Sequence, residues 1–249
     1  MSGLSALISA HFRNSYRLKP FVLATMLGLA VFFIVGFVAL VCALAIVPET
    51  RSANPDAAKI ARYLAMLVYG SGFIAMGLNV NIFTANSLVK EKAQRIHESI
   101  LGAPVGVRKL WMAKSLAVFL PGLALCELFS IATFVGVEAL VIAPRMGFVV
   151  SAATLLSGLA LVPIAYFPIC CIVILVGLAG NPVSGNVIAN VAFSTLIALT
   201  MNLATRAGLD LGSPAFALAN LAFAALLGLV VLALLPRLTK ERVILSCKN

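Results

Sequence analysis

The sequence predicts an all-α membrane protein with six transmembrane helices. Of its 249 residues, 62% are hydrophobic and only 10% are charged, whereas a soluble domain has about 45–50% apolar and about 25% charged residues. The apolar residues gather in runs of the roughly 20 residues that a helix needs to cross a hydrocarbon core about 30 Å thick. The charged residues lie between these runs. The net charge of +10 therefore reports membrane topology rather than a nucleic-acid partner.

The first element, residues 1–19, is expected to be an N-terminal interfacial amphipathic helix. Leu4, Leu7, Ile8 and Phe12 form an apolar stripe beside basic residues, which is typical of a helix lying in the membrane surface. A solvated tail is the alternative. The following run, 21–47, exceeds the roughly 7–15 apolar residues of a signal peptide. We therefore expect it to be retained as the first span.

The remaining elements complete a single transmembrane domain over residues 1–249. Proline residues at 163 and 168 predict a kink in the fourth span, and polar residues make the fifth the weakest span. Pro236 follows the end of the sixth span. Spans two to six are expected at 63–84, 116–143, 148–178, 187–203 and 215–235, with a cytoplasmic tail at 236–249.

The distribution of basic residues predicts the orientation. Thirteen Lys and Arg residues fall in the N-terminal segment, the segment between spans two and three, and the tail, whereas five fall on the other side. Because loops rich in Lys and Arg stay in the cytoplasm, both termini should be cytoplasmic.

The long polar segment inside the chain, 88–110, gives the main functional signal. It reads LVKEKAQRIHESILGAPVGVRKL. Good helix formers run from Leu88 to Leu101, and Gly102-Ala103-Pro104 then ends the helix, because glycine tolerates a left-handed cap and proline commonly follows it. The segment predicts a short charged helix in the cytosol before the chain re-enters the membrane.

At this segment the sequence resembles the permease subunits of type-2 ABC exporters. The family has an acidic-basic pair, then an acidic residue with two aliphatic residues, a proline, and a lysine entering the third span. The matching residues here are Glu91, Lys92, Glu98, Ile100, Leu101, Pro104 and Lys114. Arg95, Ile96 and His97 stand where the family often has small residues.

The resemblance implies a cytoplasmic coupling helix that docks on a separate ATPase subunit, where charged pairs suit an exchangeable interface. The residues implied in this coupling are Glu91, Lys92, Arg95, His97, Glu98, Leu101 and Pro104. It further implies two ABC ATPase subunits that bind ATP and Mg, a second copy of this chain or a homologous permease, and surrounding membrane lipids. The expected location is a bacterial or archaeal cytoplasmic membrane.

No catalytic, cofactor or metal site is expected in the chain itself. The phosphate-binding pattern G-x-x-x-x-G-K-[ST] is absent from the sequence, so ATP hydrolysis belongs to a partner. The five cysteines and two histidines show no metal-ligand spacing, and we expect the cysteines to serve as small apolar packing residues.

Polar residues inside the spans are candidates for a translocation pathway. They are Asn79, Asn81, Glu127, Asn190 and Asn202. Hydrogen bonding between helices is the alternative role. Glu138 is expected near the outer interface, where a carboxylate costs little. Gly70, Gly72 and Gly77 predict a thin helix surface suited to close packing, expected at a subunit contact.

Two other functions remain open. A secondary transporter needs repeated halves and ion-coupling carboxylates in mid-membrane. The sequence offers only Glu127 as such a carboxylate. A membrane scaffold protein would use the same spans without transport.

Overall fold

The computed structural model describes residues 8–9, 20–93, 106–149, 152–180, 182–206 and 208–246, and every regular element it describes is helical. Six of its helices are long and apolar enough to cross a membrane, so the prediction of an all-α, multi-pass membrane protein is confirmed. Most of the predicted N-terminal helix, 1–19, lies outside these residues.

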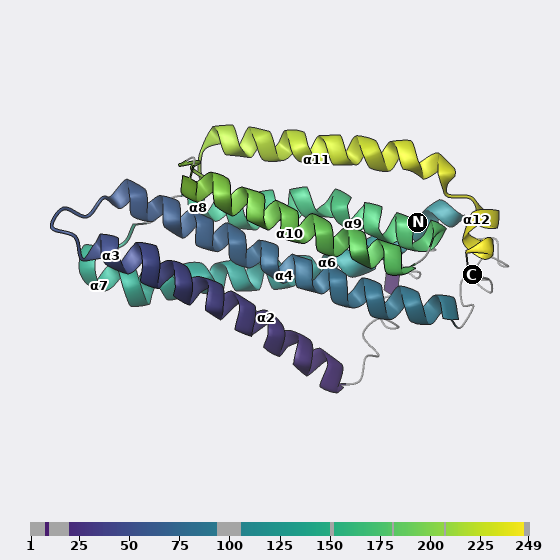
Figure 1. Ribbon diagram of the computed structural model, residues 1–249, viewed down its shortest axis with the longest axis horizontal. Helices are drawn as coiled ribbons and strands as arrows, with labels where there is room; N and C mark the ends of the chain where they lie inside the picture. Colours follow the sequence, from purple (N-terminus) through teal and green to yellow (C-terminus); the bar gives the residue numbers. More distant parts are fainter. Residues whose placement is uncertain are drawn as a thin grey trace.

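The helices run back and forth as an elongated bundle (Figure 1). The first span consists of α2 (Pro20–Val41), η1 (Cys42–Ile46) and α3 (Val47–Thr50), and the second is α4 (Ala57–Ala93). The third consists of α6 (Val107–Val137), η2 (Glu138–Ile142) and α7 (Ala143–Met146). The fourth consists of α8 (Ala152–Leu156), η3 (Ser157–Leu161) and α9 (Val162–Ala179). The fifth is α10 (Pro182–Arg206), and the sixth is α11 (Pro214–Leu234), followed by η4 (Leu235–Arg237) and α12 (Lys240–Leu245).

Helix α4 is the centre of the bundle. It contacts α2, α6, α9 and α10, and its apolar residues, including Leu64, Leu67 and Met76, are fully buried. Its 37 residues correspond to about 55 Å of helix, well beyond a hydrocarbon core of about 30 Å. One uninterrupted helix therefore joins the second span, predicted at 63–84, to the first residues of the polar segment 88–110.

Three five-residue π-helical segments widen the bundle helices, and each is followed after one intervening residue by a proline. Segments η1, η2 and η3 precede Pro48, Pro144 and Pro163, respectively. A proline lacks the backbone donor for the carbonyl four residues earlier, and its ring collides with that carbonyl. A wider turn relieves the collision. The irregularity expected at Pro163 is thus this π-helical segment.

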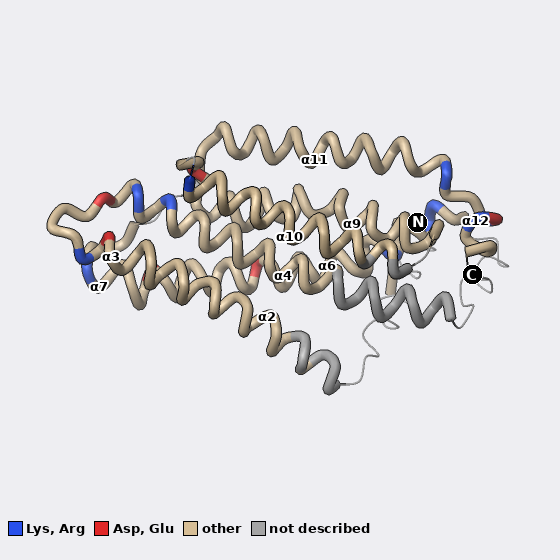
Figure 2. Tube along the Cα trace, in the orientation of Figure 1, with Lys and Arg blue, Asp and Glu red and all other residues tan. Residues whose placement is uncertain are grey.

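Lys, Arg, Asp and Glu of the described chain lie mostly towards the two ends of the bundle (Figure 2), and many of the exposed side chains between the ends are apolar. Exposed side chains such as Phe32, Leu140 and Leu218 suit contact with lipid, which solvates apolar groups. Arg108, Lys109, Arg237, Lys240 and Arg242 define what we call the basic end, and Glu49, Asp56, Lys59, Arg145 and Asp210 define the mixed-charge end.

Candidate functional site

The predicted coupling segment begins as the last turn of α4. Glu91 and Lys92 belong to this helix, which ends at Ala93. The chain re-enters the bundle at Gly106, whose extended backbone (φ −72°, ψ 137°) precedes the first turn of α6. The other predicted coupling residues, Arg95, His97, Glu98, Leu101 and Pro104, lie outside the described residues. Both flanks of the segment nevertheless lie at the basic end.

Basic side chains surround the point where α6 begins. Arg108 and Lys109 are exposed in the first turn, whereas Lys114, which the family resemblance includes, is only 3% exposed. The C-terminal helix α12 closes the same end of the bundle, because the Ser246 hydroxyl donates to the Leu178 carbonyl at 3.0 Å. The basic end is therefore a folded surface built from several helices.

Asn79 lies between α4 and α6. It is 3% exposed, and its Nδ2 donates to the Val118 carbonyl at 2.9 Å. About three helical turns away along the same two helices, the Ser130 hydroxyl donates to the Val68 carbonyl at 3.2 Å. Since both bonds join the same two helices, Asn79 acts in the structure as a contact between spans two and three.

The other candidate pathway residues are spread over different surfaces. Glu127 is half-buried on α6, and Asn190 and Asn202 are exposed on α10. The Asn202 amide donates to the Ala198 carbonyl of its own helix at 2.8 Å. Asn81 lies on α4, but its side chain is outside what the structure describes. Within one chain, the described candidates do not converge on a common cavity.

An exposed polar face on α10 is the feature that sequence reasoning found only in part. Asn190, Ser194, Asn202 and Thr205 are all exposed and fall within about 120° of the helix circumference over about 22 Å. Ser194 and Thr205 were not among the predicted site residues. A helical projection of the fifth span joins them to the two asparagines, because all four share one side. The Asn202 amide and the Thr205 hydroxyl donate to carbonyls of their own helix, and the side chains remain exposed, so this face offers polar groups to a neighbouring chain or to water.

Gly70, Gly72 and Gly77 pack inside the chain, which corrects their expected place at a subunit contact. A methyl group on Gly77 would meet the Phe193 ring of α10, and one on Gly72 would meet Ser130 and Cys126 of α6. Gly70 abuts Phe37 of α2 in the same way. These glycines let three neighbours approach the central helix closely.

Glu138 lies towards the end of the third span, as expected, but it is buried rather than open to the interface. It is 2% exposed at the mixed-charge end, and its Oε1 accepts a hydrogen bond from the Val149 backbone N–H. Nearby, the Arg145 guanidinium donates to the Thr50 hydroxyl at 2.9 Å. The carboxylate is thus an internal acceptor that fixes the connection after the third span, rather than a group bathed by the interface.

Among the described residues, no group of three His, Cys, Asp or Glu side chains is placed to hold a metal ion. Cys42, Cys126, Cys170 and Cys171 are buried free thiols, as expected for small packing residues. Comparison with protein-family models, curated proteins and solved structures finds no match for this chain. The proposal below therefore depends on the chain's own sequence and geometry.

Proposed function

We propose that this chain is the membrane-spanning permease subunit of an ATP-driven ABC exporter. In this proposal two permease chains form the translocation pathway, and two separate ATPase subunits bind ATP and Mg on the cytoplasmic side. The chain itself performs no catalysis. Its location is the cytoplasmic membrane of a bacterium or archaeon.

The observation that carries the proposal is the continuity of α4 with the charged segment. Glu91 and Lys92, the first pair of the family-like pattern, are on the helix that contacts α2, α6, α9 and α10. A displacement of the cytoplasmic end of α4 is therefore passed directly to four neighbours, since packed helices move as stiff bodies. This is the arrangement that coupling ATP hydrolysis to a membrane pathway requires.

The basic end supports the orientation in the proposal. The described part of this end has Lys90, Lys92, Arg108, Lys109, Arg237, Lys240 and Arg242 against two acidic residues, Glu91 and Glu241. Because positive charge is retained in the cytoplasm, this end faces the ATPase subunits. Both termini then lie on the same side.

The polar face of α10 supports a second permease chain. Asn190 and Asn202 are exposed on the outside of the single chain, so they reach a shared polar pathway only when another subunit covers that face. Two such faces, related by two-fold symmetry, would enclose polar groups from both chains. The pathway is thus completed by the dimer.

Charge reversal tests the proposal. The tagged chain is purified from its native membrane, and the co-purifying ATP-binding subunit is quantified. Glu91→Lys and Glu98→Lys should each lower its recovery about tenfold or more, because like charges across an interface cost several kcal/mol. Glu241→Lys is the matched control, because Glu241 is exposed on α12 at the same end.

The outcomes separate the competing functions. Unchanged recovery with both reversals contradicts docking through this segment. If no ATP-binding subunit accompanies the wild-type chain, the result favours a secondary transporter or a scaffold protein. Loss of recovery in Glu241→Lys as well would mean that general charge at this end, rather than the segment, controls association.

A further inference from the structure

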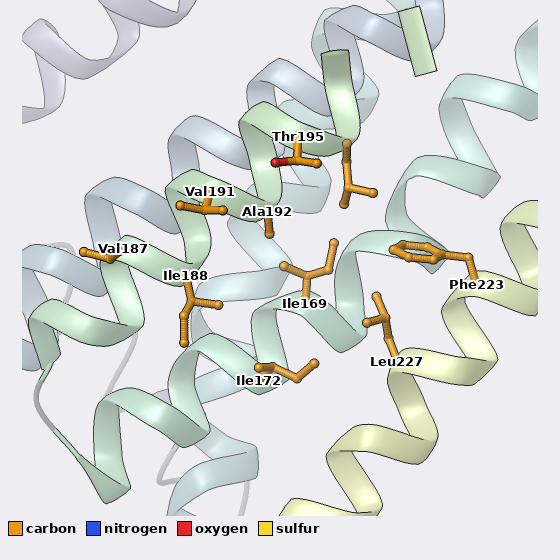
Figure 3. Close-up of a pocket in the computed structure, with 10 residues that line it drawn as sticks. Ile169, Ile172, Val187, Ile188, Val191, Ala192, Thr195, Phe223 and Leu227 are labelled. Carbon is orange, nitrogen blue, oxygen red and sulfur yellow. The ribbon is translucent and has the colours of Figure 1, made fainter. Parts of the chain in front are cut away.

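An apolar groove runs between α9, α10 and α11 (Figure 3), on the side of the bundle where α11 stands apart (Figure 1). Its volume is about 470 Å³, within the roughly 300–1,000 Å³ typical of ligand sites. Ile169 and Ile172 form the α9 side, Val187 and Leu196 mark its two ends on α10, and Phe223 and Leu227 form the α11 side. The ligand that such a surface accepts is a hydrocarbon.

The depth of the groove matches one leaflet of a bilayer. Helix α10 has 25 residues, or about 37 Å, close to the roughly 40–45 Å thickness of a bilayer with its headgroups. Val187 and Leu196 lie about 7 Å and about 21 Å from the start of α10. The groove therefore extends from just beneath the headgroups of the leaflet at the basic end to about the bilayer midplane.

Basic residues lie near the end of the groove that is closest to the membrane surface. Arg237 ends η4, ten residues after Leu227, and Arg242 is exposed on α12. Helix α12 is held against the end of α9 by the Ser246 bond to Leu178, so these charges are fixed beside α9 and α11. Basic residues next to gaps between transmembrane helices attract anionic lipid headgroups.

We propose that the groove holds one acyl chain of an anionic phospholipid from the leaflet at the basic end, with the headgroup near Arg237 and Arg242. The apolar lining of the groove favours a hydrocarbon chain. The position of the groove along α10 indicates the leaflet at the basic end, and the two arginines favour a negatively charged headgroup. The proposal rests on the membrane-spanning fold and not on the proposed transport function.

Photo-crosslinking in vesicles tests the proposal. The purified chain is reconstituted with phosphatidylglycerol that has a diazirine midway along one acyl chain, and labelled residues are identified by mass spectrometry. Labelling should concentrate on 187–196 and 223–227, above the level at Phe32 and Phe33 of α2, which are exposed and do not line this groove. If Phe32 and Phe33 are labelled as strongly as the groove residues, the proposal is overturned. Protection of 187–196 and 223–227 also overturns it and indicates that a second protein chain covers the groove.

Two sets of variants test the acyl-chain site and the headgroup site separately. Ala192→Trp fills the groove and should reduce labelling there several-fold, whereas Ala225→Trp, on the exposed opposite side of α11, should not. Replacing Arg237 and Arg242 by Gln should lower the preference for phosphatidylglycerol over phosphatidylcholine by about fivefold for each charge removed. An unchanged preference overturns the headgroup assignment. The labelling map of the wild-type chain decides the acyl-chain assignment even if Ala192→Trp does not fold.

Discussion

Asn79 links the central helix α4 to the third span, because its side-chain Nδ2 donates a hydrogen bond to the Val118 carbonyl at 2.9 Å. The bond lies beside Gly122, where an added methyl group would come within 2.7 Å of the Asn79 Nδ2. Such a close approach leaves no room for a water-filled passage between the two helices at this level. Asn79 therefore joins two helices within the chain.

We expect Asn79→Ala to lower the free energy of unfolding by about 1 kcal/mol, since hydrogen bonds between membrane helices average about 0.6 and reach about 1.7 kcal/mol. Unfolding from mixed micelles measures the change. Asn202→Ala is the control, because the Asn202 amide bonds only its own helix, and its effect should be smaller. A larger loss in Asn202→Ala would contradict the role assigned to Asn79.

Gly185 controls how closely α9 and α10 pack. A methyl group at Gly185 would lie 2.9 Å from the Val173 carbonyl oxygen and 3.3 Å from the backbone of Gly177. Because backbone atoms cannot rotate away, Gly185→Ala should destabilise the chain by about 1–3 kcal/mol. Gly228→Ala, in open space on α11, should be neutral or stabilising by up to about 1 kcal/mol. Equal thermal midpoints for the two variants would refute the tight contact.

The sequence predicts the number and class of the spans because bilayer thickness imposes a length and a composition on each helix. It does not predict which side chains meet. Hydropathy treats Glu138 as a charge that belongs at the interface, whereas its burial depends on the Val149 N–H placed opposite it by the fold. Gly77 shows the same limit: a small residue indicates close packing, but only the fold shows that Phe193 is the neighbour.

The candidate site, too, is predicted by the sequence only in part. Local spacing identifies the charged pair Glu91 and Lys92, and it is the long unbroken α4 that connects this pair to the bundle centre. The asparagines of α10 were found from their polarity alone. A helical projection puts Ser194 and Thr205 on the same side, but only the fold shows that this side is exposed.

Glu138 is expected to stabilise the chain as a hydrogen-bond acceptor rather than as a charge. Glu138→Gln keeps an oxygen that can accept from Val149 and removes a buried charge, so its thermal midpoint should be unchanged or higher. Glu138→Ala leaves the Val149 N–H without its acceptor and should cost about 1–3 kcal/mol. Limited proteolysis near Gly147, which has a φ of +77°, should be faster only in Glu138→Ala. A midpoint that falls equally in both variants would show that the charge itself is required.

Cysteine cross-linking tests whether the polar face of α10 meets a second subunit. Ser194 lies on that face and is exposed, so two copies of Ser194→Cys should form a disulfide-linked dimer when the membrane is oxidised, provided their β-carbons approach within about 4.5 Å. Cys247 is replaced by Ser in every variant, and the four buried native thiols are retained. Leu221→Cys is the matched control, because Leu221 is 44% exposed on α11 at a similar distance from the basic end. Dimers from Leu221→Cys and none from Ser194→Cys would place the subunit contact on α11 rather than on the polar face of α10.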